Sequence, residues 1–150
     1  FYIRSMKTSL LISAIVCCVL LLAKCTSIEA NNKKDLDENM LDMMMYHDNL
    51  GLYLRKADAD YSSWLLEGMD STLQVIAKKF DEHRKLSDPF LTSYKKLLAP
   101  SIKNIRSAIR QNDFPAAITS YRLLTKNCNK CHLDNDIEKT VIDGTDPSIH

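Results

Sequence analysis

Glycine and proline are scarce in this sequence of 150 residues, with 3 and 4 copies respectively. An all-β fold needs many such residues in its tight turns, so their scarcity argues against that class. Charge of one sign is not in excess, because 20 basic and 19 acidic residues leave a formal net charge of +1. Such a balance gives no electrostatic footprint for nucleic acid. We also find no internal repeat and no convincing strand alternation.

The common arrangements of catalytic side chains are missing as well. The sequence has no Ser-His-Asp constellation, no glycine-rich phosphate loop and no pair of carboxylates singled out by its spacing. We therefore do not expect an enzyme that acts through its own side chains.

Residues 1–30 have the pattern of a secretory signal, with a basic start followed by an uncharged run over 8–23. That run is shorter than the ~20 residues of a membrane-spanning helix. Cleavage after Ala30 would release a free protein. The sequence before Cys25 also resembles a bacterial lipoprotein box, although Lys24 stands where that pattern has a small residue. We predict export to the periplasm or to the outer face of a bacterial membrane, with Cys25 as lipid anchor in the second case.

Residues 31–150 are expected to form one all-α domain. Apolar residues recur at helical spacing in four segments: 36–54, 61–80, 90–109 and 114–133. Pro100 stands inside the third segment, where proline removes a backbone donor, so we expect a kink or a break there. Trp64 is predicted to be a core residue of the second segment. Four such helices with short links predict an antiparallel four-helix bundle.

One motif carries chemistry. Cys128, Cys131 and His132 stand in the order C-x-x-C-H, the attachment signature of a c-type haem. On a helix the two cysteines lie on one side, ~4.5 Å apart along the axis, so both thiols can reach vinyl groups of one porphyrin. The next histidine is then placed beneath the iron. The sequence predicts one covalent haem c, with His132 as proximal iron ligand.

Two other interpretations of the motif remain open. Cys128 and Cys131 could form a disulfide, which export would permit, in a haem-free helical binding module. The two cysteines and His132 could instead bind zinc. Three histidines could then supply the fourth ligand: His47, His83 and His150.

The position of the motif resembles that of the class II c-type cytochromes, the cytochrome c-prime family. Every methionine precedes His132, so a sixth iron ligand must come from an earlier helix. The segment from Tyr121 to His132 and the pattern over 40–50 carry the resemblance, which covers about residues 36–142. The resemblance implies a four-helix bundle whose first helix covers the distal side of the haem. It also implies a homodimer.

The helix predicted over 36–54 supplies two candidate iron ligands, Met44 and His47, although a methionine at helical spacing can equally be a core residue. Tyr121 is a candidate to pack on the porphyrin. A bound thioether or imidazole would make the iron six-coordinate, which suits electron transfer with a partner protein that the sequence does not identify. If neither binds, the iron would stay open to NO or CO, as in a sensor or scavenger. We expect electron transfer.

Overall fold

The computed structural model describes residues 34–80 and 89–149. The predicted signal over 1–30, with Cys25, lies outside these described residues, as do His83 and His150. The chain divides into two compact units, 1–35 and 36–150, and the second contains all of the described helices. No strand occurs in the described ranges, so the all-α prediction is confirmed for them.

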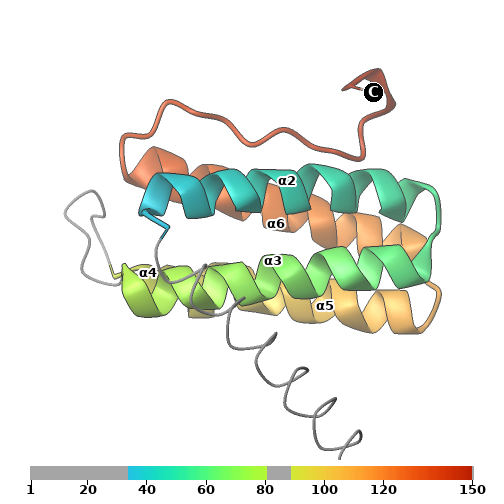
Figure 1. The fold of residues 1–150 in the computed structure, drawn as a ribbon. Coiled ribbons are helices and arrows are strands. Elements are labelled where there is room, and N and C mark those ends of the chain that lie inside the picture. The colour runs from blue at the N-terminus through green and yellow to red at the C-terminus, as the bar shows by residue number, and fades with distance from the viewer. Residues whose placement is uncertain (1–33, 81–88, 150) are drawn as a thin grey trace, which may run out of the picture. The chain divides into compact units, whose positions relative to one another are not determined.

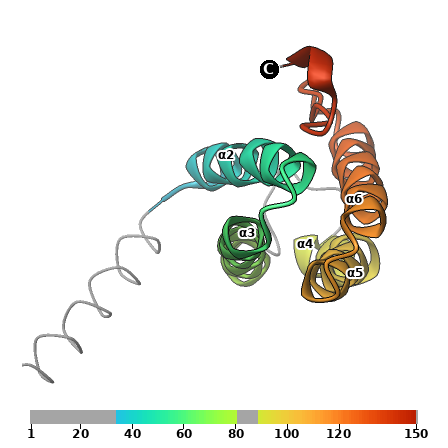
Figure 2. The same cartoon turned by 90° about the vertical axis from the view of Figure 1, so that its right-hand side faces the viewer.

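Four long helices build the second unit, and they lie around a common centre in Figure 2. In Figure 1 they are labelled α2 (Leu36–Arg55), α3 (Ala59–Lys79), α5 (Ala99–Arg110) and α6 (Phe114–Asp134). A short helix α4 (Phe90–Ser93) and a π-helical segment η1 (Tyr94–Leu98) precede α5, and a 3-10 turn η2 covers Pro147–Ile149. Helix α2 packs chiefly on α3, and α5 packs chiefly on α6. Of the helices that the structure describes, none combines the length and the apolar character needed to cross a bilayer.

The turns after α2 and α5 are built alike. In each turn one residue adopts a left-handed conformation, Ala57 with φ 54° and Asn112 with φ 55°. The next residue, Asp58 or Asp113, then donates its backbone N–H to the last turn of the helix just completed. The carboxylates of these aspartates also accept a backbone N–H of the following helix, at 3.0 Å in both turns. Each turn therefore ends one helix and begins the next within three residues.

Pro100 lies in the first turn of α5, and the irregularity expected there is the π-helical segment Tyr94–Leu98 just before it. The helical hydrogen bonds change register in η1, so the chain stays helical through the proline. The carbonyl of Leu97 accepts a hydrogen bond from Asn127 Nδ2 of α6 at 2.8 Å. A side chain that directly precedes Cys128 thus ties α6 to the irregular part of the neighbouring helix.

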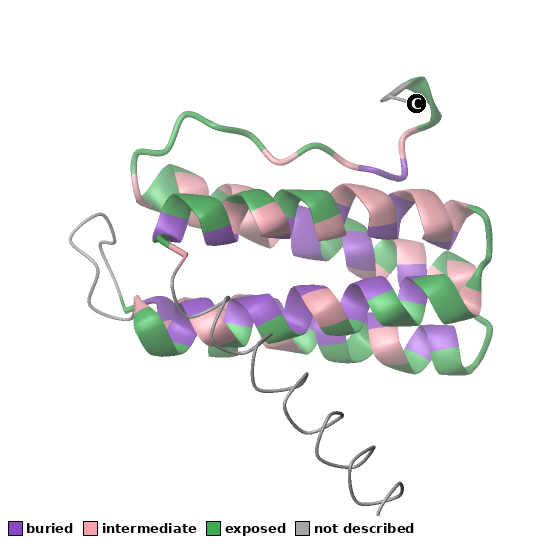
Figure 3. Ribbon diagram, viewed as in Figure 1, coloured by how far each residue is buried: buried purple, intermediate pink, exposed green. Residues whose placement is uncertain are grey.

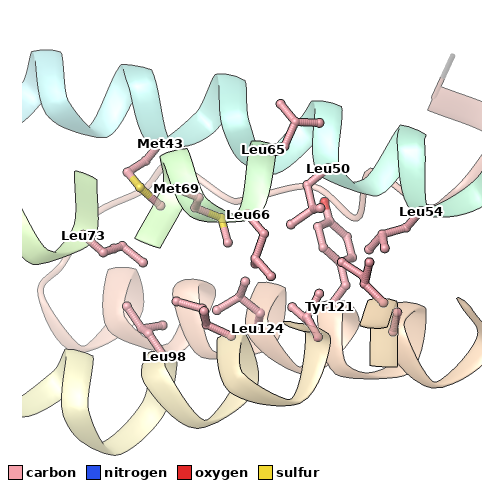
Figure 4. Close-up of a cluster of buried hydrophobic side chains, with 14 of the residues drawn as sticks. Met43, Leu50, Leu54, Leu65, Leu66, Met69, Leu73, Leu98, Tyr121 and Leu124 are labelled. Atoms are coloured by element: carbon pink, nitrogen blue, oxygen red, sulfur yellow. The ribbon is translucent and has the colours of Figure 1, made fainter. Parts of the chain in front are cut away.

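The core is made of the buried faces of all four long helices (Figure 3). In the close-up of Figure 4, Met43 and Met69 lie near one end of the cluster, whereas Leu50, Leu54 and Tyr121 gather near the other. Each of these five side chains is buried. The apolar stripe predicted along α2 is therefore largely correct.

The prediction for Trp64 is wrong, because its side chain is 59% exposed. Leu65 and Leu66 are the buried residues at this point of α3. The buried face of the helix therefore begins one residue later than the prediction placed it. Trp64 instead lies against Tyr46 and Tyr61, with ring centroids 6.2 and 5.4 Å apart. These contacts cover part of its indole outside the core.

Candidate haem-attachment site

The three residues of the C-x-x-C-H motif occupy the last two turns of α6. Cys128 is half-buried and packs against the core, and Cys131 and His132 are also half-buried. The helix ends directly after them, where Asp136 adopts φ 54° and the N–H of Ile137 donates to the carbonyl of His132 at 2.9 Å. This left-handed residue reverses the chain, so the segment that follows runs back along α6 (Figure 1).

Cys128 and Cys131 are free thiols. Burial raises the pKa of Cys128 to about 12. Burial, and then the nearby carboxylate of Asp134, also raise the pKa of Cys131. Both sulfurs therefore keep their protons at neutral pH.

The imidazole of His132 is oriented by the backbone. Its Nδ1 lies 2.6 Å from the carbonyl oxygen of Lys139. A carbonyl can only accept, so Nδ1 carries the proton and the Nε2 of the neutral ring keeps its lone pair. Metal-ligating histidines commonly have this arrangement, in which the second ring nitrogen donates to a carbonyl or a carboxylate.

The segment 137–146, which we call the C-terminal strap, is fastened to α6. Asn129 makes two bonds to it, because its Oδ1 accepts the N–H of Val141 at 2.6 Å and its Nδ2 donates to the carbonyl of Val141 at 2.9 Å. Further along, the hydroxyl of Tyr121 accepts the N–H of Gly144 at 3.2 Å. The strap thus follows α6 from its end to its middle.

The far end of the strap also carries an ion pair. Arg122 Nε lies 3.1 Å from Asp143 Oδ2, and Thr145 donates its N–H and its hydroxyl to Asp143 Oδ1 at 2.9 and 2.6 Å. Burial alone would raise the pKa of Asp143, but the hydrogen bonds from Thr145 and Arg122 together hold it below its ordinary value. This carboxylate is therefore more stable ionised in the folded strap than in an unfolded chain.

Two glycines let the strap approach α2 closely. A Cβ placed on Gly51 would lie 2.5 Å from the carbonyl carbon of Gly144, and one placed on Gly144 would lie 2.8 Å from the hydroxyl oxygen of Tyr121. No side chain fits at these separations without movement of the backbone or of the buried tyrosine.

His47 and Tyr121, two of the predicted site residues, meet in the interior. Their rings stack with centroids 4.6 Å apart, and both side chains are buried. His47 Nε2 lies 2.9 Å from Thr125 Oγ1, whose own proton goes to the carbonyl of Tyr121 at 3.1 Å, so Nε2 is the donor. His47 Nδ1 lies 3.0 Å from the hydroxyl of Tyr121 and 3.2 Å from Asp48 Oδ1. Both ring nitrogens of His47 are therefore engaged.

Met44, the other predicted distal ligand, is 38% exposed on α2, whereas Met43 is buried and Met40 is half-buried. The contact between His47 and Thr125 places the middle of α2 about one turn before Cys128 on α6. The structure thus brings His47 and Tyr121 together, and it leaves the thioether of Met44 partly accessible.

Three contributors to the site were missed by the sequence analysis: Thr125, Asn129 and the carbonyl of Lys139. Thr125 follows Tyr121 by four residues and precedes Cys128 by three, so helical spacing alone could have placed it on their face. The bonds of Asn129 and Lys139 involve backbone groups of the strap. No residue pattern marks such bonds.

Within residues 34–80 and 89–149, no three His, Cys, Asp or Glu side chains are grouped so as to hold a metal ion. The chain was also compared with known proteins. No family model, no curated protein and no solved structure matches it.

Proposed function

We propose that this chain is an exported mono-haem c-type cytochrome that transfers electrons. The observation that carries the proposal is the orientation of His132, whose Nδ1 donates to the carbonyl of Lys139 and whose Nε2 keeps a lone pair. The two cysteines of the same motif are free thiols. Cys128 and Cys131 would hold the haem through thioethers. In each of these bonds the S–H adds across a vinyl group, with sulfur bonding to one carbon and the proton going to the other. When bound, the haem supplies an iron that alternates between its ferric and ferrous states.

The proposed architecture is the antiparallel four-helix bundle of the class II c-type cytochromes. The contact between His47 and Thr125 supports it, because it brings the middle of α2 against α6. If the two helices are antiparallel, the N-terminal half of α2 comes level with the haem motif. The side of the haem opposite His132 would then be covered by α2.

We propose Met44 as the sixth iron ligand. A thioether has no proton to relocate and gives up at most a weak hydrogen bond when it binds iron. His47 would have to release Thr125 or Tyr121, which are its partners in the buried interior. A Met ligand also raises the reduction potential of a haem.

The proposed location is the periplasm or the outer face of a bacterial membrane. The basic start and the apolar run within residues 1–30 support export. The soluble form and the form anchored through Cys25 are both compatible with that signal. A homodimer is part of the same proposal and rests on the family resemblance alone.

One alternative is favoured by a specific observation. Because both nitrogens of His47 are engaged, the iron would have an open position if Met44 did not reach it. The protein would then bind NO or CO as a sensor or scavenger. The two functions differ in their response to CO.

The deciding experiment is an absorption spectrum of the full chain, produced together with a haem-attachment system. The ferric and dithionite-reduced protein are recorded with and without CO, and a pyridine haemochrome reports the thioethers. We expect covalent haem and sharp reduced bands that CO does not change. Broad bands that shift with CO would replace electron transfer by gas binding, and the lack of a Soret band would refute both functions.

Variants make this experiment specific. Serine at both Cys128 and Cys131 should abolish covalent haem, whereas Lys130→Ala should retain it, because Lys130 lies inside the motif but forms an exposed ion pair with Asp134. Met44→Leu should make the reduced bands sensitive to CO. His47→Gln should leave them insensitive if Met44 is the ligand.

A further inference from the structure

Asn129 is one of the two variable residues of the C-x-x-C-H motif, where haem attachment itself demands no particular side chain. Its carboxamide nevertheless makes the two bonds to Val141 that fasten the strap, at 2.6 and 2.9 Å. The other variable residue, Lys130, forms an exposed ion pair with Asp134 within α6. The two variable positions therefore have different tasks.

The bonds of Asn129 bear on His132 through a short covalent path. Val141 lies two residues after Lys139, whose carbonyl accepts the Nδ1–H of His132 at 2.6 Å. The helix-ending turn at Asp136 fixes the first part of the chain between His132 and Lys139. Most side chains from Asp136 to Thr140 are exposed, so packing alone does not hold the carbonyl in place.

We infer that Asn129 is a positioning residue for the iron ligand. By clamping Val141 it holds the carbonyl of Lys139 against Nδ1 of His132, which fixes both the tautomer and the rotation of the imidazole. This inference rests on the proposed function, because His132 needs a fixed orientation only if it is the proximal ligand of the haem iron.

The clamp has an electronic consequence as well as a geometric one. A hydrogen bond from Nδ1–H to a carbonyl makes the imidazole a stronger electron donor at Nε2. A stronger donor favours ferric iron, so the intact clamp lowers the reduction potential. Loss of the clamp should shift the potential in the positive direction.

The test compares Asn129→Ala with Asn127→Ala in the full chain. Asn127 is a matched control on the same helix, because it also donates through its amide to a backbone carbonyl, but that carbonyl belongs to Leu97 in η1 and not to the strap. A third variant, Asn129→Asp, keeps the acceptor for the Val141 N–H and loses the donor to its carbonyl. It should therefore retain part of the effect.

The first measurement is NMR of the haem-free full chain. Asn129→Ala should accelerate exchange of the Val141 amide at least ~tenfold, the change that ~1.4 kcal/mol of lost protection produces. It should also change the ring nitrogen shifts of His132, and Asn127→Ala should do neither. If Asn129→Ala leaves both signals as in the parent protein, the inference is overturned.

The second measurement is the reduction potential of the haem-loaded protein. The inference requires a positive shift in Asn129→Ala, a smaller one in Asn129→Asp and none in Asn127→Ala. Equal potentials in all of these proteins would overturn the electronic part. If haem never attaches while the NMR differences appear, the proposed function fails and the clamp on His132 stands.

Discussion

Tyr121→Phe should destabilise the protein strongly although it removes a single oxygen atom. Burial raises the pKa of Tyr121 above its ordinary value, so the hydroxyl stays protonated and can donate as well as accept. It lies 3.0 Å from the carbonyl of His47, to which it can donate, and it accepts the N–H of Gly144 at 3.2 Å. All of these groups are buried.

The magnitude follows from the N–H of Gly144, which phenylalanine would leave without a partner, because the carbonyl of His47 lies inside α2 and keeps its helical hydrogen bond. A buried donor left unsatisfied costs ~1–3 kcal/mol, so we expect a loss of about 1–3 kcal/mol in the free energy of unfolding. The ring still fills its site, so no sizeable cavity adds to this loss. Against a total stability of ~5–15 kcal/mol the change is large.

Urea unfolding followed by circular dichroism measures this loss directly, with an unchanged m-value as the check that the unfolded state is the same. Tyr53→Phe is the control, because Tyr53 is only half-buried and contacts Tyr61 through its ring, with the two ring planes tilted by 39°. We expect less than ~0.5 kcal/mol for this control. If Tyr121→Phe is no more destabilising than Tyr53→Phe, the hydroxyl does not join the strap to α2 and α6 as argued.

Three further predictions concern the turns and the strap. Ala57→Gly should raise the free energy of unfolding by about 0.5–1 kcal/mol in urea titrations. Ala57 has φ 54°, and glycine avoids the steric cost of that conformation. An unchanged free energy of unfolding would contradict strain at this turn. Gly144→Ala should lower the stability and speed exchange of the Val141 amide, since its Cβ would lie 2.8 Å from the hydroxyl of Tyr121; unchanged exchange would show that the strap adapts. The pKa of Asp143 is lower in the folded protein than in the unfolded chain. Its ionised carboxylate therefore stabilises the fold fully at a pH above the ordinary Asp pKa of ~3.9. This stabilisation is lost as the pH falls through the pKa that Asp143 has in the folded protein. Protection of the strap amides should therefore decrease at low pH in the parent protein, and a parallel decrease in Asp143→Asn would assign the effect to another group.

The helices could be predicted because their signals are local. Apolar spacing located the first helix at 36–54, and α2 ends only one residue later, at Arg55. The start of α3 at Ala59, before the expected Tyr61, follows from Asp58, whose carboxylate caps the helix. Trp64 was misplaced because three large apolar residues in a row leave the phase of the buried stripe ambiguous, and only packing against the other helices decides it.

The candidate site could be predicted only in part. The order of Cys128, Cys131 and His132 is a property of the sequence, and their placement on one helix follows from it. The hydrogen bonds that orient His132 and engage His47 depend on groups distant in the chain, among them the carbonyl of Lys139 and the hydroxyl of Thr125. Backbone partners of this kind have no residue signature, so the strap could not be foreseen.

The strap also sets an order of events during biosynthesis. Lys139 and Val141 leave the ribosome after His132, so the imidazole is translated before the carbonyl that orients it exists. Under the proposed function, an attachment enzyme would meet the cysteines while the histidine can still rotate, and docking of the strap would then be the closing step of maturation.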